Sequence, residues 1–279
     1  MDFLCTIDDG YIEPIKNLLY SIYVNNGGEH RFYFLFINIC EENRKEVVEF
    51  AKNKCKSEAV FVEYLNDMLN VMPAEGAWSK EIYLRLFAPY VLNNIDKILY
   101  LDGDTIVNGN IRELFFLENF SNYFVAAIPN DVQESHKLRL GLGEECTYIN
   151  SGVMLMNLEK IRNVFSIEDI EMLLTKLRKR LVFPDQDFIN IVFKDNIKLL
   201  DVKYNYMISL SERTDSYPKL KDFKICHYVL AKPWNEEFPY KTDTIYFKYL
   251  LKRKQFKRYF YLLYKHRKTR LVYKIKKQG

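Results

Sequence analysis

The stretch KILYLDGDTIV, residues 97–107, decides the fold of this chain. A run of β-favouring apolar residues stops at two carboxylates, which one glycine separates, and then it resumes. Side chains at positions i and i+2 of an extended chain lie on the same face, so Asp102 and Asp104 can converge on one ion. Gly103 lets the backbone bend and leaves room for a ligand.

This acidic pair predicts a metal site. Carboxylates are hard oxygen ligands that suit Mg²⁺ or Mn²⁺, and such ions are commonly completed by phosphates of a substrate. The motif therefore points to a substrate that carries a diphosphate. Asp-Gly-Asp is also typical of a solvated turn, because Asp and Gly favour turns. The apolar residues on both sides favour the metal site, since the ligand crevice of an open α/β sheet lies at the carboxyl ends of its strands.

The composition excludes several classes of protein. A chain of 279 residues with 21 Tyr, 20 Phe, 10 Gly and 8 Pro is neither disordered nor fibrous, and it can bury a substantial core. Its five cysteines form no Cys-x-x-Cys pair, which argues against a disulfide framework and against a zinc cluster. The first residues contain neither a basic leader nor a long apolar segment, so we expect a cytoplasmic protein.

Strands and helices alternate along the chain. We expect strands at 3–7, 32–39, 59–64, 123–128 and 197–200, a strand from 97 that ends at the acidic pair, and a turn followed by a strand within 148–157. We expect helices at 15–22, 41–51, 80–90, 167–180 and from 184 onward, and a long loop at 65–78. This order predicts an α/β fold with a mostly parallel sheet flanked by helices, because strand–helix–strand units close with right-handed crossovers.

Six short motifs resemble those of glycosyltransferase family 8, in the same order and at similar spacing. They read IDDGY at 7–11, YLRL at 83–86, LYLDGD at 99–104, INSGV at 149–153, PDQD at 184–187 and HYVLAKPW at 227–234. The chain is similar to the bacterial galactosyl- and glucosyltransferases that extend lipopolysaccharide or lipooligosaccharide. The resemblance implies a GT-A fold, Rossmann-like in its sheet, together with a UDP-sugar donor, Mn²⁺ and transfer with retention at the anomeric carbon.

The resemblance also implies roles for individual residues. Asp102, Asp104 and His227 would be the metal ligands, for Mn²⁺ or alternatively for Mg²⁺. A neutral imidazole is a sensible third ligand for Mn²⁺ on chemical grounds too. Asp8 would bind the uracil edge and Tyr11 would stack on the base. For Asp8 the cap of a helix is an equally good interpretation.

A second group of residues would surround the diphosphate and the sugar. Arg85 and Lys232 bring positive charge to the leaving group, although an ordinary ion pair is the alternative for Arg85. Asn150, Asp185 and Gln186 match positions that line the donor sugar. Retention needs either a nucleophile on the β face or a front-side route through an ion pair. Because Gln186 is a poor nucleophile, we expect the front-side route, in which the metal and Lys232 stabilise the departing UDP while Asp185 and Gln186 steady the charge of the sugar.

Two positions depart from the family pattern. Gly10 stands where the family usually has Asn, which removes an expected ribose contact. Between His227 and Lys232 the chain has one residue fewer than the family pattern and no glycine. The sequence therefore predicts neither the backbone contact to the diphosphate nor the preference for one donor sugar.

The last 32 residues differ in charge from the rest. Residues 248–279 carry 13 Lys and Arg and no acid, so residues 1–247 carry 28 bases against 37 acids. We therefore divide the chain into a catalytic domain, 1–247, and a basic and aromatic segment, 248–279. Such a segment suits an anionic membrane surface, where each base adds about 1 kcal/mol. Bases and aromatic residues do not separate into two helical faces, so we expect no neat amphipathic helix. A solvated tail is the alternative.

The sequence thus predicts a retaining, Mn²⁺-dependent hexosyltransferase that uses a UDP-hexose and a saccharide or glycolipid acceptor to build a cell-surface glycan at the inner face of the cell membrane. A nucleotidyltransferase that makes sugar nucleotides is an alternative, but it calls for a Gly-rich loop with Arg and Lys after the first strand, and residues 8–14 contain none. The other alternative, a nucleic-acid-binding protein, is supported by the basic tail alone. The acidic body argues against nucleic acid as a partner.

Overall fold

The computed structural model describes residues 1–72, 79–214, 217–229, 232–235 and 243–278. Its centre is a seven-stranded sheet in the order β3-β2-β1-β4-β7-β6-β8. These strands are β1 (Asp2–Thr6), β2 (Arg31–Phe36), β3 (Glu58–Glu63), β4 (Lys97–Leu101), β6 (Val125–Ala127), β7 (Val153–Asn157) and β8 (Ile197–Leu199). Strand β7 runs antiparallel to β4 and β6, whereas the other pairs are parallel. The predicted α/β fold with a mostly parallel sheet is confirmed.

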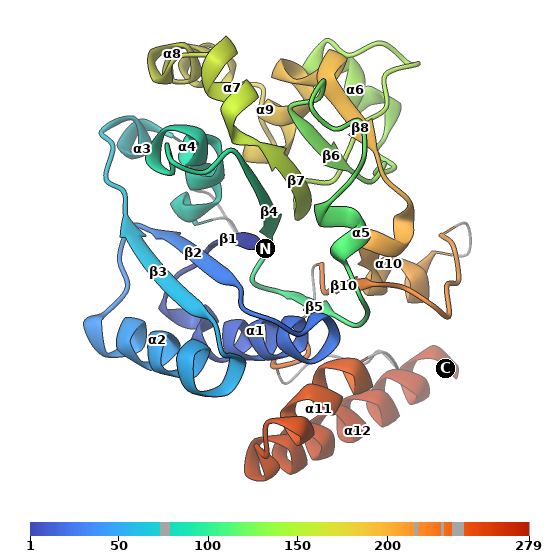
Figure 1. Ribbon diagram of the computed structural model, residues 1–279. Coiled ribbons are helices and arrows are strands. Elements are labelled where there is room, and N and C mark those ends of the chain that lie inside the picture. Colours follow the sequence, from blue (N-terminus) through green and yellow to red (C-terminus); the bar gives the residue numbers. More distant parts are fainter. Residues whose placement is uncertain (73–78, 215–216, 230–231, 236–242, 279) are drawn as a thin grey trace.

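Helices cover both faces of this sheet (Figure 1). Helices α1 (Ile12–Asn26) and α2 (Glu41–Cys55) lie on one face, and α4 (Leu84–Val91), α7 (Leu158–Val164) and α8 (Ile167–Leu177) lie on the other. Successive side chains of a strand point to opposite faces, so Phe3 and Cys5 pack in the core beneath α1 while Leu4 packs in the core beneath α4. Apolar runs such as β1 and β2 therefore stay buried on both sides.

Short elements connect these parts. They are the 3₁₀ turns η1 (Asp9–Tyr11), η2 (Lys80–Tyr83), η3 (Lys194–Asn196) and η4 (Val202–Tyr204), and the helices α3 (Met68–Val71), α5 (Arg112–Phe115), α6 (Glu134–Leu140), α9 (Pro184–Val192) and α10 (Ile208–Arg213). The helix expected at 80–90 is divided into η2 and α4. The loop expected at 65–78 contains α3, and its residues 73–78 lie outside the described part of the chain.

A second, three-stranded sheet brings distant parts of the chain together. Its strands are β5 (Thr105–Val107), β10 (Ile225–His227) and β9 (Tyr206–Met207), with β10 in the middle. His227 pairs with Thr105 across the antiparallel side and with Met207 across the parallel side. As expected, the strand before the acidic pair ends there, and the two halves of the run 97–107 are separate strands, β4 and β5, which belong to different sheets. The acidic pair lies in the bend between them.

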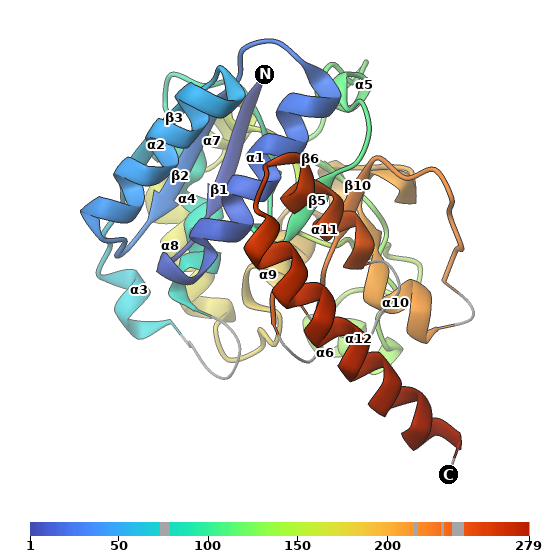
Figure 2. The same cartoon turned by 90° about the horizontal axis from the view of Figure 1, so that it is seen from below.

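The chain ends in two helices, α11 (Asp243–Lys252) and α12 (Phe256–Gln278). The side chains of Tyr249 and Leu250 are fully buried, and Leu262 of α12 is buried in the same core cluster. The division proposed between 247 and 248 falls inside α11, so the first part of the basic segment packs as part of the body. Beyond it, α12 extends away from the body (Figure 2). In the described part of the chain, no helix combines the length and the apolar character needed to cross a membrane.

Candidate active site

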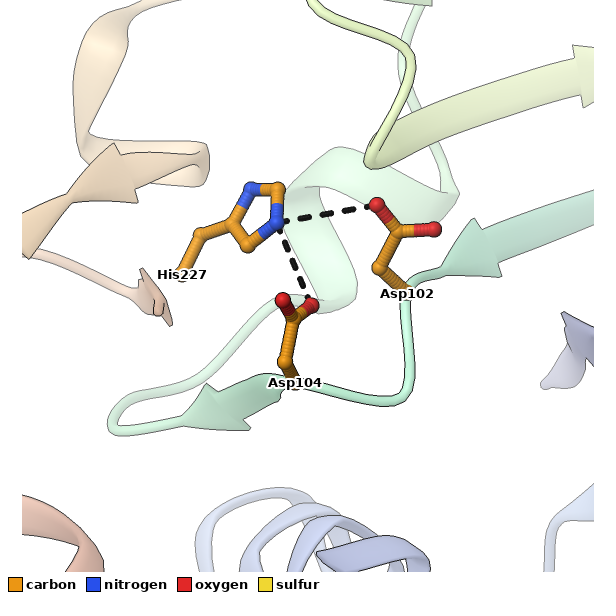
Figure 3. A group of neighbouring side chains, drawn as sticks. All are labelled: Asp102, Asp104 and His227. Carbon is orange, nitrogen blue, oxygen red and sulfur yellow. Dashed lines mark ion pairs between the residues drawn. The ribbon is translucent and has the colours of Figure 1, made fainter. Parts of the chain in front are cut away.

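Three side chains of types that can bind a metal ion meet where β4 ends and β10 ends. His227 Nε2 lies 3.6 Å from Asp102 Oδ2 and 3.2 Å from Asp104 Oδ1 (Figure 3). One ligand atom from each of the three lies within 4.8 Å of the other two. The carboxylates come from the bend after β4, and the register of β10 against β5 sets the imidazole opposite them. The structure thus brings together the three residues that the sequence analysis named as metal ligands.

This cluster fits a divalent cation. Adjacent ligands of an octahedral ion with bonds near 2.1 Å lie about 3 Å apart, which matches the separation of His227 from Asp104. Asp104 Oδ1 is buried and has no hydrogen-bond partner, although buried carboxylate oxygens normally have one. A Cβ atom on Gly152 would lie 2.2 Å from His227 Cε1 and 2.6 Å from Asp102 Oδ2. Glycine at 152 therefore keeps open the space that these ligands face.

Arg85 holds two carboxylates of the site in place. Its guanidinium is 2.9 Å from Asp102 Oδ1 and 3.0 Å from Asp185 Oδ2, and the side chain is 4% exposed. Asp102 Oδ1 also accepts a hydrogen bond of 2.7 Å from the hydroxyl of Tyr100, which leaves Oδ2 to face His227. In this structure Arg85 therefore orients acidic groups, and its contact with a diphosphate stays a prediction.

Lys232 lies directly beside the acidic pair. Its ammonium group contacts Asp104 Oδ2 and donates a hydrogen bond of 2.8 Å to the carbonyl of Tyr228. Burial by itself would raise the pKa of Asp104, but the charge of Lys232 outweighs burial and holds that pKa well below its usual range. Asp104 is thus an ionised carboxylate in a cationic setting. Leu230 and Ala231, in the segment that is one residue short, lie outside the described residues.

The predicted sugar-side residues form a buried group at the start of α9. The side chain of Asn150 donates a hydrogen bond of 2.9 Å to Gln186 Oε1. The hydroxyl of Ser151 donates one of 2.9 Å to Asp185 Oδ2. Burial raises the pKa of Asp185, against the opposing effect of the Arg85 guanidinium. Pro184 at the first helical position suits the start of α9, and the next two side chains contact the loop that leads into β7.

The predicted nucleotide-side residues lie on the turn after β1. Asp8 caps η1, because its Oδ1 accepts a hydrogen bond of 2.8 Å from the backbone of Gly10. The ring of Tyr11 covers Gly103 so closely that a Cβ atom there would lie 2.7 Å from its Cδ1. Trp234 approaches Tyr11 edge-on, with ring centroids 6.0 Å apart. Asp8 therefore does have the capping role, and its contact with uracil stays a prediction.

Comparison with known proteins decides the family. The sequence profile named "Glycosyl transferase family 8" matches residues 3–237. The chain belongs to glycosyl transferase family 8. It is 30% identical over 253 residues to the lipopolysaccharide 1,2-glucosyltransferase of Escherichia coli, a match that covers 82% of this chain and 72% of that protein. It is 30% identical over 200 residues to the lipopolysaccharide 1,3-galactosyltransferase of Salmonella typhimurium, which covers 66% of this chain and 59% of that protein.

Solved structures agree with the fold. A crystal structure of the galactosyltransferase LgtC with donor and acceptor sugar analogues superposes with a TM-score of 0.80 at 23% identity, over 89% of this chain and 95% of that one. The glycosyltransferase GlyE of Streptococcus pneumoniae superposes with a TM-score of 0.66 at 21% identity, over 89% of this chain and 60% of that one. The predicted family, its GT-A fold and the enzyme class are confirmed, and the chain is a hexosyltransferase.

Several residues that hold the site of this family 8 enzyme were not predicted from its sequence. Asn205 Oδ1 lies 2.8 Å from Nδ1 of His227, and Tyr148 accepts a hydrogen bond of 3.0 Å from Gln186. The hydroxyl of Tyr148 in turn donates a hydrogen bond of 2.5 Å to Asp187. Asp187 is fully buried and also accepts a hydrogen bond of 2.7 Å from His136. Local sequence offers one weak signal for Asn205, a polar residue inside the apolar run YNYM at 204–207. It offers none for His136.

Proposed function

We propose that this enzyme is a retaining transferase that moves glucose or galactose from a UDP-hexose to a saccharide or glycolipid acceptor, with Mn²⁺ bound by Asp102, Asp104 and His227. The observation that carries the proposal is this cluster of three ligand atoms beside Lys232 and Tyr11. The named relatives from Escherichia coli and Salmonella typhimurium support lipopolysaccharide or a similar cell-surface polysaccharide as the product. One nitrogen ligand among carboxylates favours Mn²⁺ over Mg²⁺.

In the proposed reaction, a bound Mn²⁺ supplies Lewis-acid stabilisation of the departing diphosphate. Tyr11 offers an aromatic face to the uracil base at the entrance of the site. Lys232 places its positive charge beside the acidic pair, where the leaving group gains negative charge. Because this stabilisation acts only as the bond to the sugar breaks, it lowers the barrier instead of merely tightening binding.

The sugar side of the site supports the front-side route. Gln186 has no ionisable group, and its carboxamide is held by Asn150 and Tyr148. Asp185 is paired with Arg85, which keeps the carboxylate in place despite the upward shift of its pKa by burial. These groups are suited to stabilise positive charge on the sugar ring, whereas neither is a free nucleophile.

The decisive experiment is release of UDP from a panel of UDP-sugars in the presence of Mn²⁺, Mg²⁺ or a chelator. We expect selective, Mn²⁺-dependent hydrolysis of UDP-glucose or UDP-galactose, which needs no known acceptor. Asp104→Ala should abolish it without loss of the fold. Asp222→Ala removes a carboxylate that is 86% exposed and should leave it unchanged.

A second incubation tests the competing enzyme class. UTP with a hexose 1-phosphate would yield a UDP-sugar and pyrophosphate from a nucleotidyltransferase. Formation of that product, or hydrolysis that persists in the Asp104→Ala variant, would contradict the proposed function. Absence of hydrolysis together with absence of UDP-sugar binding in calorimetry would also contradict it.

We also propose that the basic segment 248–279 binds an anionic membrane surface through α12. Phe256, Phe260 and Tyr264 are 53%, 63% and 65% exposed on this helix. Large exposed aromatic side chains among bases suit the headgroup region of a bilayer. Because α12 extends away from the body, its outer part has room to lie along a surface (Figure 2).

A further inference from the structure

Asn205 is buried against the metal cluster and has no assigned role. It follows η4, one residue before β9, and its side chain is 0% exposed. Its Oδ1 lies 2.8 Å from His227 Nδ1, on the side of the imidazole opposite the carboxylates. Its Nδ2 lies 2.8 Å from Oδ1 of Asn150. The parallel pairing of β9 with β10 explains why the two segments meet, since Met207 is the register partner of His227.

The direction of these hydrogen bonds follows from groups that cannot reverse. The backbone N–H of Gly152 donates a hydrogen bond of 3.0 Å to one side-chain atom of Asn150, so that atom is the carboxamide oxygen of Asn150. The backbone N–H of Ser151 donates a hydrogen bond of 3.1 Å to a side-chain atom of Gln186, so that atom is the oxygen Oε1. The same Oε1 accepts a hydrogen bond from Asn150 Nδ2. A backbone N–H is always a donor, so both carboxamides have one orientation.

The orientation of the Asn150 carboxamide determines the orientation of Asn205, which in turn determines which nitrogen of His227 carries a proton. Because Asn150 presents its oxygen, Asn205 must present its NH₂ group to it and its own oxygen to His227. An oxygen acceptor at 2.8 Å requires that Nδ1 of His227 carries a proton. In the neutral imidazole, the lone pair is then on Nε2, the nitrogen that faces Asp102 and Asp104.

We propose that Asn205 is a positioning residue that fixes the tautomer of His227 and thereby prepares Nε2 as a ligand. A hydrogen bond to the other ring nitrogen is the usual means by which proteins orient a metal-binding histidine. Here a carboxamide performs this task, and its own direction is set through Asn150 by the backbone of Gly152. The inference rests on the metal site of the proposed function, but it concerns a hydrogen bond that exists without the ion.

Two nearly isosteric variants separate this role from packing. Asn205→Leu removes the acceptor, whereas Asn205→Asp keeps an acceptor for His227 and loses the donor to Asn150. If Asn205 fixes the tautomer, Asn205→Leu should weaken Mn²⁺ binding by about 10- to 100-fold, and Asn205→Asp should stay within about threefold of the unaltered protein. Free Mn²⁺ measured by electron paramagnetic resonance gives both affinities. If Asn205 only fills space or completes a polar network, both variants should lose affinity equally, which would overturn the proposal.

The tautomer itself is measured on metal-free protein by long-range ¹H–¹⁵N spectra of the histidine rings at pH 8. The chain has 4 His, and the signals of His227 are those missing from a His227→Gln variant. We expect a proton on Nδ1 in the unaltered protein and loss of that proton in Asn205→Leu. An unprotonated Nδ1 in the unaltered protein overturns the proposal even if neither variant folds. If the protein binds no Mn²⁺, the proposed function fails, while this spectrum still decides the role of Asn205.

Discussion

Lys232 and Asp104 are an ion pair at the place where a leaving group would gain charge. The lysine also neutralises a carboxylate whose Oδ1 has no hydrogen-bond partner. A cation in this position serves two ends, since it keeps Asp104 ionised before the donor binds and faces the diphosphate once the donor is present. These two roles predict different kinetic effects.

Lys232→Ala should lower kcat by about 100-fold and change KM by no more than about threefold, because the lost charge acts mainly on the transition state. Steady-state release of UDP from the preferred donor measures both constants. Lys232→Arg keeps the charge and should retain more of kcat. A rise in KM at constant kcat would assign Lys232 to donor binding alone.

His30 gives the protein a defined acid sensitivity. Its ring packs edge-on against Phe3 at 5.6 Å, and burial lowers its pKa from 6.5 to about 4. Above pH 6.5 the ring is neutral in the folded and the unfolded chain, so it does not affect stability. As the pH falls from 6.5 to about 4, the unfolded chain takes up the proton first, and stability is lost across this window.

The free energy of unfolding should therefore fall by roughly 2 kcal/mol between pH 7 and pH 4.5 through His30 alone. His30→Leu should lack this component, while it retains the losses that come from other groups. Urea denaturation of both proteins at the two pH values measures the difference. Equal losses in the two proteins would show that His30 takes up its proton in the folded state as readily as in the unfolded chain.

A buried cation, Arg253, contributes to the packing of helices α11 and α12 against α1. The guanidinium of Arg253 is 3.4 Å from Glu13 and 3.1 Å from Asn17, lies over the ring of Phe50, and is 2% exposed. Burial lowers the pKa of Arg253, although Glu13 opposes this effect. Because Glu13 is two residues after Tyr11, this contact links the end of the chain to the nucleotide side of the site.

Arg253→Met removes the ion pair with Glu13, while Glu13 keeps its ion pair with Lys16. The free energy of unfolding should therefore fall by about 2 kcal/mol. Urea denaturation measures this loss, and limited proteolysis should show faster cleavage in α11 and α12. Lys257→Met, at an exposed position of α12, is the matched control and should change neither. An unchanged cleavage rate for Arg253→Met would mean that the apolar core beneath α11 holds these helices without the ion pair.

The outer face of α12 yields a separate prediction about membranes. Replacing Phe256, Phe260 and Tyr264 by Ser should weaken binding to anionic vesicles by at least about tenfold, because the aromatic side chains lose their burial in the headgroup region. Co-sedimentation with phosphatidylglycerol vesicles measures this, and phosphatidylcholine vesicles control for charge. The matched variant replaces Phe116, Leu138 and Met172, which are 59%, 59% and 60% exposed elsewhere. Equal loss in the two variants would remove the specific role of α12.

The molecule as a whole joins two sheets at one site. The large sheet contributes the acidic pair through β4, and the small sheet contributes His227 through β10. A ligand that contacts both should therefore stabilise the entire fold by mass action. UDP with Mn²⁺, each at about 100 times its dissociation constant, should add roughly 2.7 kcal/mol per independently bound ligand, and raise Tm by several degrees.

Differential scanning fluorimetry tests this prediction, with chelator added to reverse it. Asp104→Ala should lose the Mn²⁺-dependent part of the shift, and Asp222→Ala should keep it, since the Asp222 carboxylate is exposed and pairs with Lys224. A shift that UDP produces equally with and without chelator would show that the nucleotide binds without the metal cluster.

Much of this arrangement could be predicted from the sequence. Apolar runs such as 32–36 are hydrophobic enough to be buried on both faces, and their alternation with helices implies a parallel sheet. Asp102 and Asp104 are local in sequence, so the geometry of a strand end places them together. The motif order identified the family, and with it His227 as a partner for residues more than a hundred positions away.

The tertiary structure alone decided the rest, because the contacts concerned are long-range. Nothing near Asn205 in the sequence shows that β9 pairs with β10 beside His227. The packing of α12 through Leu262 against α11 is likewise a long-range contact, and the pattern of bases and aromatic residues in α12 predicts no amphipathic face. The strands, the acidic pair and the family could be predicted from the sequence, since these depend on local pattern. Only tertiary packing determined which polar groups orient the ligands, because a hydrogen bond depends on where two distant segments meet.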